Sequence, residues 1–338
     1  MKLIIDAMGG DNAPLEILKG AAQAVAEYDD IELVLTGRES ELREICENEK
    51  ISLDRISFID APEVVTMEDS AQSVVMSKKN SSMAVGLKTL AAGGGEAFIS
   101  AGNTGALMTG ATLLVRCVKG VKRAAIATIL PMEKPVLMID SGSNVTVTPE
   151  YLLQFGILGS VYMEQLFGIE RPKVGLLNNG TEEHKGTPTM VEAHKLLKNC
   201  AGINFVGNVE AKSIPFGECD VLVTDGFTGN IVLKTIEGLA KFMMKKLKGI
   251  FMKNALNKVA ALMIKKEVGG LKKSFDSGEY GGAPFLGISK PVFKAHGSSD
   301  AKAIKNAIRQ AREYIVKGVP GIIDERISKS LAENISAN

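Results

Sequence analysis

Short runs rich in valine and isoleucine alternate with longer helical patterns along this chain of 338 residues. This alternation is typical of a mostly parallel sheet whose two faces are covered by helices, so it predicts a three-layer α/β/α fold. The predicted strands lie at 3–5, 32–35, 56–59, 97–100, 125–129, 136–139, 174–177, 204–206 and 221–223. The length suits a single catalytic domain, 1–338, which can be divided into two lobes around a cleft.

Polar loops follow five of the predicted strands. Glycine, asparagine, aspartate, serine and threonine are frequent in these loops, which lie at 6–12, 100–105, 140–144, 178–186 and 224–230. Ligands of open α/β sheets bind outside the carboxyl ends of the strands. Any one of these loops could be only a tight turn, but five loops on one rim predict one extended polar cleft.

The segment 97–115 contains no charged residue and approaches the roughly 20 apolar residues that cross a bilayer. Its serine, asparagine, threonine and glycine residues instead favour a buried strand, a tight loop and a buried helix. The chain reaches Asp6 after three apolar residues, too few for the apolar stretch of a secretory signal. The four cysteines lie far apart, as reduced core residues do, so we expect a soluble intracellular enzyme.

A lysine-rich segment, 234–273, differs from the rest of the chain. It contains eleven lysines and two acidic residues, a net charge of +9, whereas the whole chain carries +1. Apolar residues recur in it at three- and four-residue spacing, which predicts a basic amphipathic helical arm. The arm could pack on the core or on a second subunit, or it could contact a membrane surface or an acidic protein. Because it contains no base-reading motif, we predict no nucleic-acid partner.

Several catalytic motifs are missing. The sequence has no GxxxxGK[ST] loop, no GxGxxG loop with an acidic residue about 20 positions later, and no GxSxG motif. These absences disfavour nucleotide hydrolysis, the usual dinucleotide site and a covalent serine mechanism. The cysteines and acidic residues are too scattered to predict a metal site, and we predict no cofactor.

The loop that begins at Ser100 is the best candidate for a phosphate site. It joins a buried strand to an apolar helix, and Gly102, Thr104 and Gly105 leave its backbone N–H groups open to an anion. Lys185, in the loop 178–186, is the best candidate to compensate the charge of a bound phosphate.

Two histidines are candidate proton donors to a departing group. His184 stands beside the predicted phosphate-binding lysine, and His296 precedes a helix in a better cleft setting. Asp6 and Asp11 would repel phosphate directly, so we interpret them as residues that orient hydrogen-bond donors.

Five motifs together closely resemble those of the bacterial phosphate acyltransferase family of phospholipid synthesis. They are DAMGGDNAP at 6–14, SAGNTGALM at 100–108, TDGFTGN at 224–230, YGGAP at 280–284 and HGSSD at 296–300. The resemblance covers nearly the whole chain.

The resemblance implies transfer of a fatty acyl group from acyl carrier protein to inorganic phosphate. The acyl phosphate would then serve a membrane glycerol-3-phosphate acyltransferase. The resemblance also implies a homodimer, a fold similar to phosphotransacetylase and the isocitrate and isopropylmalate dehydrogenases, and a cytoplasmic enzyme attached peripherally to the inner face of the membrane. The arm would serve dimerisation and membrane contact, and basic surface would meet the acidic carrier protein.

We predict direct attack of a phosphate oxygen on the thioester carbonyl, with donors that stabilise the tetrahedral oxyanion. The predicted catalytic residues are Asn103, Lys185, Asp225, Asn230 and His296, and the predicted phosphate-binding residues are Asp6, Gly9, Gly10, Asp11, Asn12, Gly102, Thr104 and Gly105. Two alternatives remain open: a nicotinamide-dependent dehydrogenase on a related fold and a non-catalytic scaffold at the membrane surface.

Overall fold

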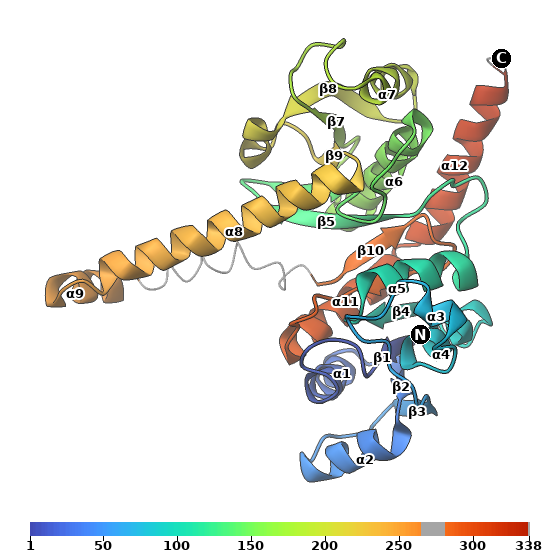
Figure 1. Cartoon of the computed structure of the whole chain (residues 1–338), viewed down its shortest axis with the longest axis vertical. Helices are drawn as coiled ribbons and strands as arrows, with labels where there is room; N and C mark the ends of the chain where they lie inside the picture. Colours follow the sequence, from blue (N-terminus) through green and yellow to red (C-terminus); the bar gives the residue numbers. More distant parts are fainter. Residues whose placement is uncertain (265–280, 337–338) are drawn as a thin grey trace.

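The computed structural model describes residues 1–264 and 281–336. Eleven strands of this described part form one continuous sheet through the molecule (Figure 1). Their order across the sheet is β3-β2-β1-β4-β11-β10-β5-β6-β9-β7-β8. The strands are β1 (Lys2–Asp6), β2 (Glu32–Gly37), β3 (Ile56–Asp60), β4 (Ala97–Ser100), β5 (Ala125–Pro131), β6 (Pro135–Ile139), β7 (Lys173–Asn178), β8 (Asn204–Glu210), β9 (Val221–Val223), β10 (Ala283–Leu286) and β11 (Val292–Lys294).

All nine predicted strands are present, and β10 and β11 are additional. Neither strand contains a run of valine and isoleucine residues, and β10 contains Pro284, which disfavours a strand in the middle of a sheet. They nevertheless occupy the centre of the sheet, where β11 pairs with β4 and β10 pairs with β5.

The sheet is mostly parallel, but its direction reverses in the middle. β1, β2, β3, β4 and β11 run in one direction, whereas β10 is antiparallel to both of its neighbours. β6 is antiparallel to β5, and β9, β7 and β8 follow β6 in parallel. The prediction that five polar loops share one rim is therefore wrong, because these loops follow two sets of strands with opposite directions.

Helices cover both faces of the sheet, which confirms the three-layer α/β/α fold. Leu3 and Ile5 of β1 point into one buried cluster, with side chains of α1, α6, α11 and α12, whereas Ile4 points into a cluster under α4 and α5. The helices are α1 (Leu15–Glu27), α2 (Glu39–Asn48), α3 (Ser73–Met76), α4 (Ser82–Ala91), α5 (Thr104–Gly110), α6 (Pro149–Phe167), α7 (Pro188–Asn199), α8 (Gly226–Phe251), α9 (Ala255–Met263), α11 (Ala301–Val316) and α12 (Val319–Ser336).

The uncharged segment 97–115 forms the predicted buried strand, tight loop and helix. Strand β4 is fully buried, and α5 continues into a π-helical turn at Ala111–Val115. A Cβ at Gly110 would lie 2.5 Å from Leu87 Cδ1, so α5 packs closely on α4. In the part of the chain that the structure describes, no helix is long and apolar enough to cross a membrane.

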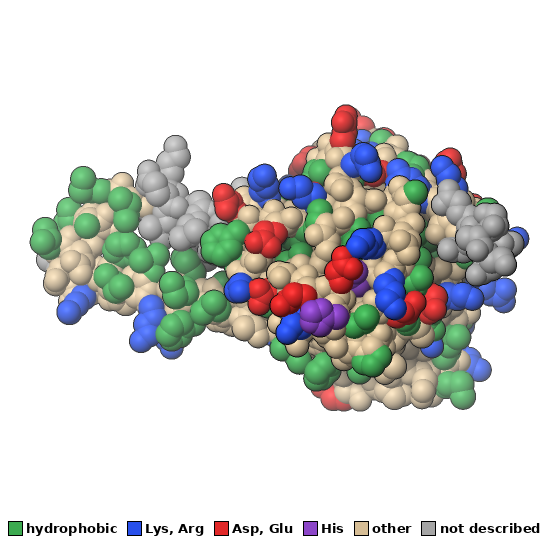
Figure 2. All heavy atoms as spheres, turned by 90° about the horizontal axis from the view of Figure 1, so that it is seen from above, with side chains coloured by type: hydrophobic (Ala, Val, Ile, Leu, Met, Phe, Trp, Pro, Cys, Tyr) green, Lys and Arg blue, Asp and Glu red, His purple; other side chains and the backbone are tan. Residues whose placement is uncertain are grey.

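Helices α8 and α9 form an arm that projects from the body of the molecule (Figure 1). Apolar side chains are exposed along it (Figure 2), and Leu239, Met243 and Ile250 each keep more than half of their surface exposed. The predicted apolar stripe therefore does not pack on the core of this chain, except near its start, where Ile236 contacts a buried cluster. The end of the predicted arm, 265–273, lies outside the described residues.

Candidate active site

The loops after β1 and β4 are packed backbone against backbone. A Cβ at Gly9 would lie 2.6 Å from Asp6 Oδ2 and 2.7 Å from Gly102 N, so only glycine fits at position 9. Asp6 is buried, and its Oδ2 accepts a hydrogen bond from Ser100 Oγ at 2.7 Å. Burial raises the pKa of Asp6, against the opposing effect of its hydrogen bonds.

The loop after β11 completes this group. Asp11 N donates to Gly297 O at 2.8 Å, and Asn12 Nδ2 donates to Ser298 O at 3.1 Å. Gly10 has a φ of +106°, which favours glycine, and a Cβ there would lie 3.0 Å from Gly297 O. We call residues 6–12, 100–105 and 294–300 the three-loop site.

Lys294 lies within the three-loop site, although it was not among the predicted site residues. Its Nζ donates to Ala101 O at 3.0 Å and also to Ala295 O. Burial lowers the pKa of Lys294 to about 8, although the charges of Asp6 and Asp11 act in the opposite direction. An ammonium group has three N–H donors, so one remains for a ligand.

His296 stands at the edge of the three-loop site with its side chain exposed. Its Nδ1 accepts a hydrogen bond from Ser298 N at 3.2 Å, so the proton of the neutral ring is on Nε2. The loss of solvent around the ring lowers the pKa of His296, and Lys294 lowers it further, whereas Glu237 raises it. The effects of Glu237 and Lys234 place α8 close to this histidine.

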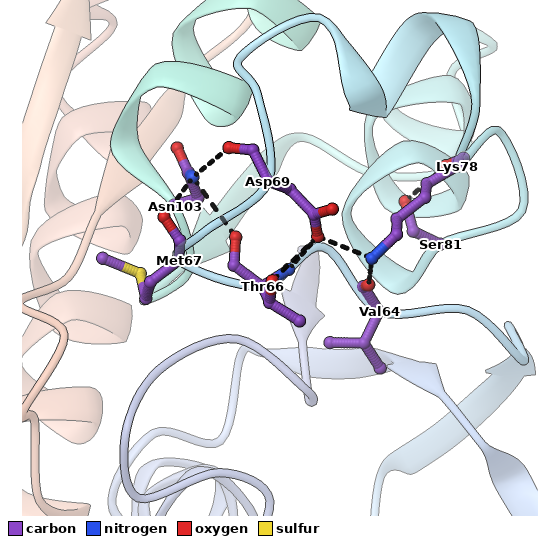
Figure 3. Close-up of polar contacts among 7 residues, drawn as sticks. All are labelled: Val64, Thr66, Met67, Asp69, Lys78, Ser81 and Asn103. Carbon is purple, nitrogen blue, oxygen red and sulfur yellow. Dashed lines mark hydrogen bonds and ion pairs between the residues drawn. The ribbon is translucent and has the colours of Figure 1, made fainter.

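Asn103 uses both ends of its side-chain amide, and Figure 3 shows the contacts of its Nδ2 atom. Oδ1 accepts a hydrogen bond from Ala106 N at 3.0 Å and thereby caps α5. Nδ2 lies 3.2 Å from Thr66 O, 3.2 Å from Met67 O and 3.1 Å from Asp69 O. The amide predicted to bind substrate thus connects α5 to the segment before α3.

Asp69 organises the same segment from its other side (Figure 3). Its Oδ2 accepts hydrogen bonds from Thr66 N at 2.6 Å and from Lys78 Nζ at 2.5 Å. Lys78 Nζ also donates to Val64 O at 2.8 Å. The hydrogen bond from Lys78 lowers the pKa of Asp69 to about 2, so this carboxylate is charged at neutral pH. The segment that Asn103 binds is therefore closed by its own hydrogen bonds.

A second group of loops lies at the carboxyl ends of β6 and β9. Asp140 is buried, and its Oδ1 accepts hydrogen bonds from Gly142 N and Ser143 N, both at 3.0 Å. Its Oδ2 accepts one from Asn144 N at 2.6 Å. Asn144 O in turn accepts from Gly226 N at 2.8 Å, so the loop after β6 fixes the start of α8.

Asp225 and Asn230 have different surroundings at this start of α8. Asp225 caps the helix, because its carboxylate accepts hydrogen bonds from Thr228 N at 2.8 Å and Thr228 Oγ1 at 2.7 Å. Asn230 is exposed, and its side chain makes no hydrogen bond with another residue of the described part. Its amide is therefore available to a ligand.

Lys185 lies beside this second group. Asn178 Nδ2 donates to Lys185 O at 3.1 Å, which closes the loop after β7. The ammonium of Lys185 makes no hydrogen bond or ion pair with any residue in 1–264 or 281–336. Thr187 lines an open hollow of about 450 Å³ together with Asp225 and Phe227, so the loop after β7 adjoins the start of α8.

The predicted site residues fall into two groups, and α8 passes from one to the other. The three-loop site contains Asp6, Gly9, Gly10, Asp11, Asn12, Gly102, Asn103, Thr104, Gly105 and His296, and the second group contains Lys185, Asp225 and Asn230. Within 1–264 and 281–336, no cluster of three or more histidine, cysteine, aspartate or glutamate side chains could hold a metal ion.

Solved structures with a similar fold include phosphotransacetylases. The enzyme from Streptococcus pyogenes matches with a TM-score of 0.64 and 18% identity over 94% of each chain. The EutD phosphotransacetylase from Staphylococcus aureus matches with a TM-score of 0.60 and 17% identity, over 93% of this chain and 94% of that one. The predicted similarity to the phosphotransacetylase fold is confirmed.

Sequence comparisons are more specific. A family model described as "Fatty acid synthesis protein" matches residues 1–321. The phosphate acyltransferase of Caldanaerobacter subterraneus subsp. tengcongensis is 48% identical over 97% of both chains, and that of Acetivibrio thermocellus is 47% identical over 93% of both chains. The chain therefore belongs to the phosphate acyltransferase family and is an acyltransferase of fatty acid and phospholipid synthesis.

Proposed function

We propose that this enzyme transfers a fatty acyl group from acyl carrier protein to inorganic phosphate. The observation that carries the proposal is the ammonium of Lys294 within the three-loop site, with one N–H donor left for an anion. The glycines of this site let its three loops pack closely against one another.

In the proposed reaction a phosphate oxygen attacks the thioester carbonyl. The new C–O bond forms, the tetrahedral oxyanion collapses, and the C–S bond breaks to release the thiolate of the carrier protein. Because phosphate is already an anionic nucleophile, the enzyme has to position it and to stabilise the oxyanion. Loss of one oxyanion donor typically lowers the rate about 100- to 1000-fold.

The free donors of the second group complete the proposed site. Lys185 and Asn230 have side chains without partners in the described residues, so both can reach substrate oxygens. His296 presents Nε2–H and is proposed to donate a hydrogen bond to the departing thiolate. Asn103 and Asp225 have a positioning role in this proposal, because their side chains are already used as helix caps.

The wider organisation also remains a proposal. We propose one catalytic domain with two lobes, which correspond to the oppositely directed halves of the sheet, and a homodimer that covers part of the apolar arm. The exposed apolar tip of the arm, flanked by lysines, supports peripheral membrane contact at the inner face of the cell membrane. The acyl phosphate would pass there to a membrane glycerol-3-phosphate acyltransferase.

Release of free thiol from palmitoyl acyl carrier protein, with and without phosphate, tests the proposed function. We expect wild-type release to require phosphate, and Lys185→Ala and Asn230→Ala to lower its rate at least about 100-fold. Lys195→Ala is the matched control, because Lys195 forms only a surface ion pair with Glu192 at 3.1 Å. Release that does not depend on phosphate would contradict the proposal.

The two alternative functions, a nicotinamide-dependent dehydrogenase and a non-catalytic membrane scaffold, predict different experimental results. A dehydrogenase would bind a nicotinamide cofactor, which a fluorescence titration detects. A scaffold would keep its membrane localisation and its cellular effect in Lys185→Ala, but would lose both when the arm is deleted. Family membership favours the acyltransferase over both alternatives.

A further inference from the structure

The loop between the π-helical turn and β5 carries four exposed cations in eight residues. They are Arg116, Lys119, Lys122 and Arg123. None of the four side chains makes a hydrogen bond or an ion pair with a residue in the part of the chain that the structure describes. By contrast, Arg43 pairs with Glu39 at 2.8 Å and Arg312 with Asp30 at 2.7 Å. We call residues 116–123 the basic loop.

The basic loop is held firmly by its backbone. Val118 N donates to Gly287 O at 2.9 Å. Gln154 accepts a hydrogen bond from Lys122 N at 2.9 Å and donates to Gly120 O at 2.8 Å. The four charges are therefore presented by a fixed backbone, which reduces the entropy lost when a partner binds.

The basic loop adjoins the second group of site residues. Ala124 O, at its end, accepts a hydrogen bond from Asn144 Nδ2 at 2.8 Å, and Asn144 O accepts one from Gly226 N. Arg123 lines an open hollow of about 420 Å³ with Asn144 and Tyr151. Only one loop therefore separates the cations from the start of α8, near Asn230.

The surroundings of the basic loop favour a protein partner over a membrane. Val118 and Val121 are buried, so the loop itself offers no apolar face of the kind that inserts into a bilayer. It packs on α12, since a Cβ at Gly120 would lie 2.3 Å from Leu331 Cδ1. Helix α12 and the tip of the arm lie on opposite sides of the molecule (Figure 1), so the basic loop is separate from the apolar arm.

We propose that the basic loop is the docking surface for the acidic carrier protein that delivers the acyl group. This inference rests on the proposed function. Unpaired cations on a rigid loop attract an acidic protein over a distance and set its orientation, with little contribution from apolar contact. The hydrogen bond from Thr148 Oγ1 at 2.5 Å and the charge of Lys122 lower the pKa of Glu150, so this carboxylate offsets one of the four positive charges and leaves the loop basic.

The test compares a carrier-borne donor with a small donor. Lys119→Glu/Lys122→Glu reverses two charges of the basic loop. Lys50→Glu/Lys173→Glu makes the same change in net charge at exposed lysines elsewhere, one of them at the amino end of β7. Phosphate-dependent thiol release is measured with palmitoyl acyl carrier protein and with palmitoyl pantetheine, at low and at high salt.

We expect the basic-loop variant to raise KM for the carrier protein about 10- to 100-fold and to lose most of the salt dependence of kcat/KM. The kcat/KM of this variant with palmitoyl pantetheine should stay at the wild-type value. The control variant should keep the wild-type kcat/KM with both donors. An equal loss with both donors, or an unchanged KM for the carrier protein, would overturn the docking surface. Failure of the proposed function is distinguishable, because wild type would then show no phosphate-dependent thiol release from either donor.

Discussion

The ammonium group of Lys294 lies where burial opposes its charge. It donates to two backbone carbonyls, and Asp6 and Asp11 are the acidic groups whose charges favour its protonated form. Its pKa of about 8 nevertheless lies below the ordinary lysine value of 10.5, so desolvation is the stronger effect. The folded protein therefore loses this proton in a pH range where the unfolded chain keeps it.

This difference predicts how stability depends on pH. Between pH 8 and pH 10.5 the unfolded chain binds more protons at Lys294 than the folded protein does, so this residue makes the free energy of unfolding rise with pH. The full change is about 3 kcal/mol, at 1.36 kcal/mol for each pKa unit. Urea unfolding of wild type and Lys294→Met at pH 7.5 and pH 10 measures it. Equal pH dependence in the two proteins would contradict this assignment.

The sequence predicted which motifs form the candidate site, but not all the contacts of the individual site residues. The motifs around Asp6, Gly102 and His296 were expected to share a site, and the structure places them together. The environment of Asn103 could not be predicted, because its three carbonyl partners come from a segment more than thirty positions earlier. Lys294 ends a strand that was not predicted, and the signal that the sequence offered was its position two residues before His296.

At the scale of elements, the first turn of α8 depends on two glycines. A Cβ at Gly226 would lie 2.7 Å from Asn144 N, and a Cβ at Gly229 would lie only 2.0 Å from Asp140 O. The helix can therefore start directly against the loop after β6. The lysine pattern predicted a helix from residue 234, whereas α8 already begins at Gly226. Site and arm thus share one helix.

Gly229→Ala tests this packing. The added methyl group would force α8 away from Asp140 O, so we expect a loss of about 1–3 kcal/mol in the free energy of unfolding and a large loss of acyl transfer. Gly238→Ala is the matched control on the same helix, because no atom lies within 4 Å of the new Cβ. This control should gain up to about 1 kcal/mol. Chemical unfolding and thiol release measure both effects, and wild-type values for Gly229→Ala would contradict the prediction.

Strands could be predicted from the sequence where a local run of apolar residues marks them. The nine strands with valine- and isoleucine-rich runs were all recognised. The position of β10 and β11 between β4 and β5 could not be read from the sequence, because pairing partners distant in the chain set it. The reversal between β5 and β6 is instead local, because only residues 132–134 connect these two antiparallel strands, and it divides the polar loops into two groups.

At the scale of the whole molecule, the arm presents apolar surface far from the core. Leu256 is 78% exposed and Met263 is 80% exposed, and neither belongs to a buried cluster of the body. Such surface needs a partner in solution or a lipid phase. Its distance from the sheet means that contact there need not disturb the fold.

Leu256→Asp/Met263→Asp is expected to abolish flotation with vesicles that contain anionic lipid, because two charges would enter the apolar tip. The unfolding midpoint should remain that of wild type. Met76→Asp/Phe216→Asp makes the same change at exposed apolar residues of the body and should still float. Flotation of the arm variant at the wild-type level would show that the tip does not contact the membrane.

The pairing of β11 with β4 has a consequence for synthesis on the ribosome. Strand β4 leaves the exit tunnel early, with β1 already available on one side, but its other neighbour is β11, near the end of the chain. Until β11 emerges, the nascent protein carries an open strand edge that contains Phe98 and Ile99. Open apolar edges recruit other chains, so this edge is a target for chaperones during translation. The last part to be translated closes the middle of the sheet.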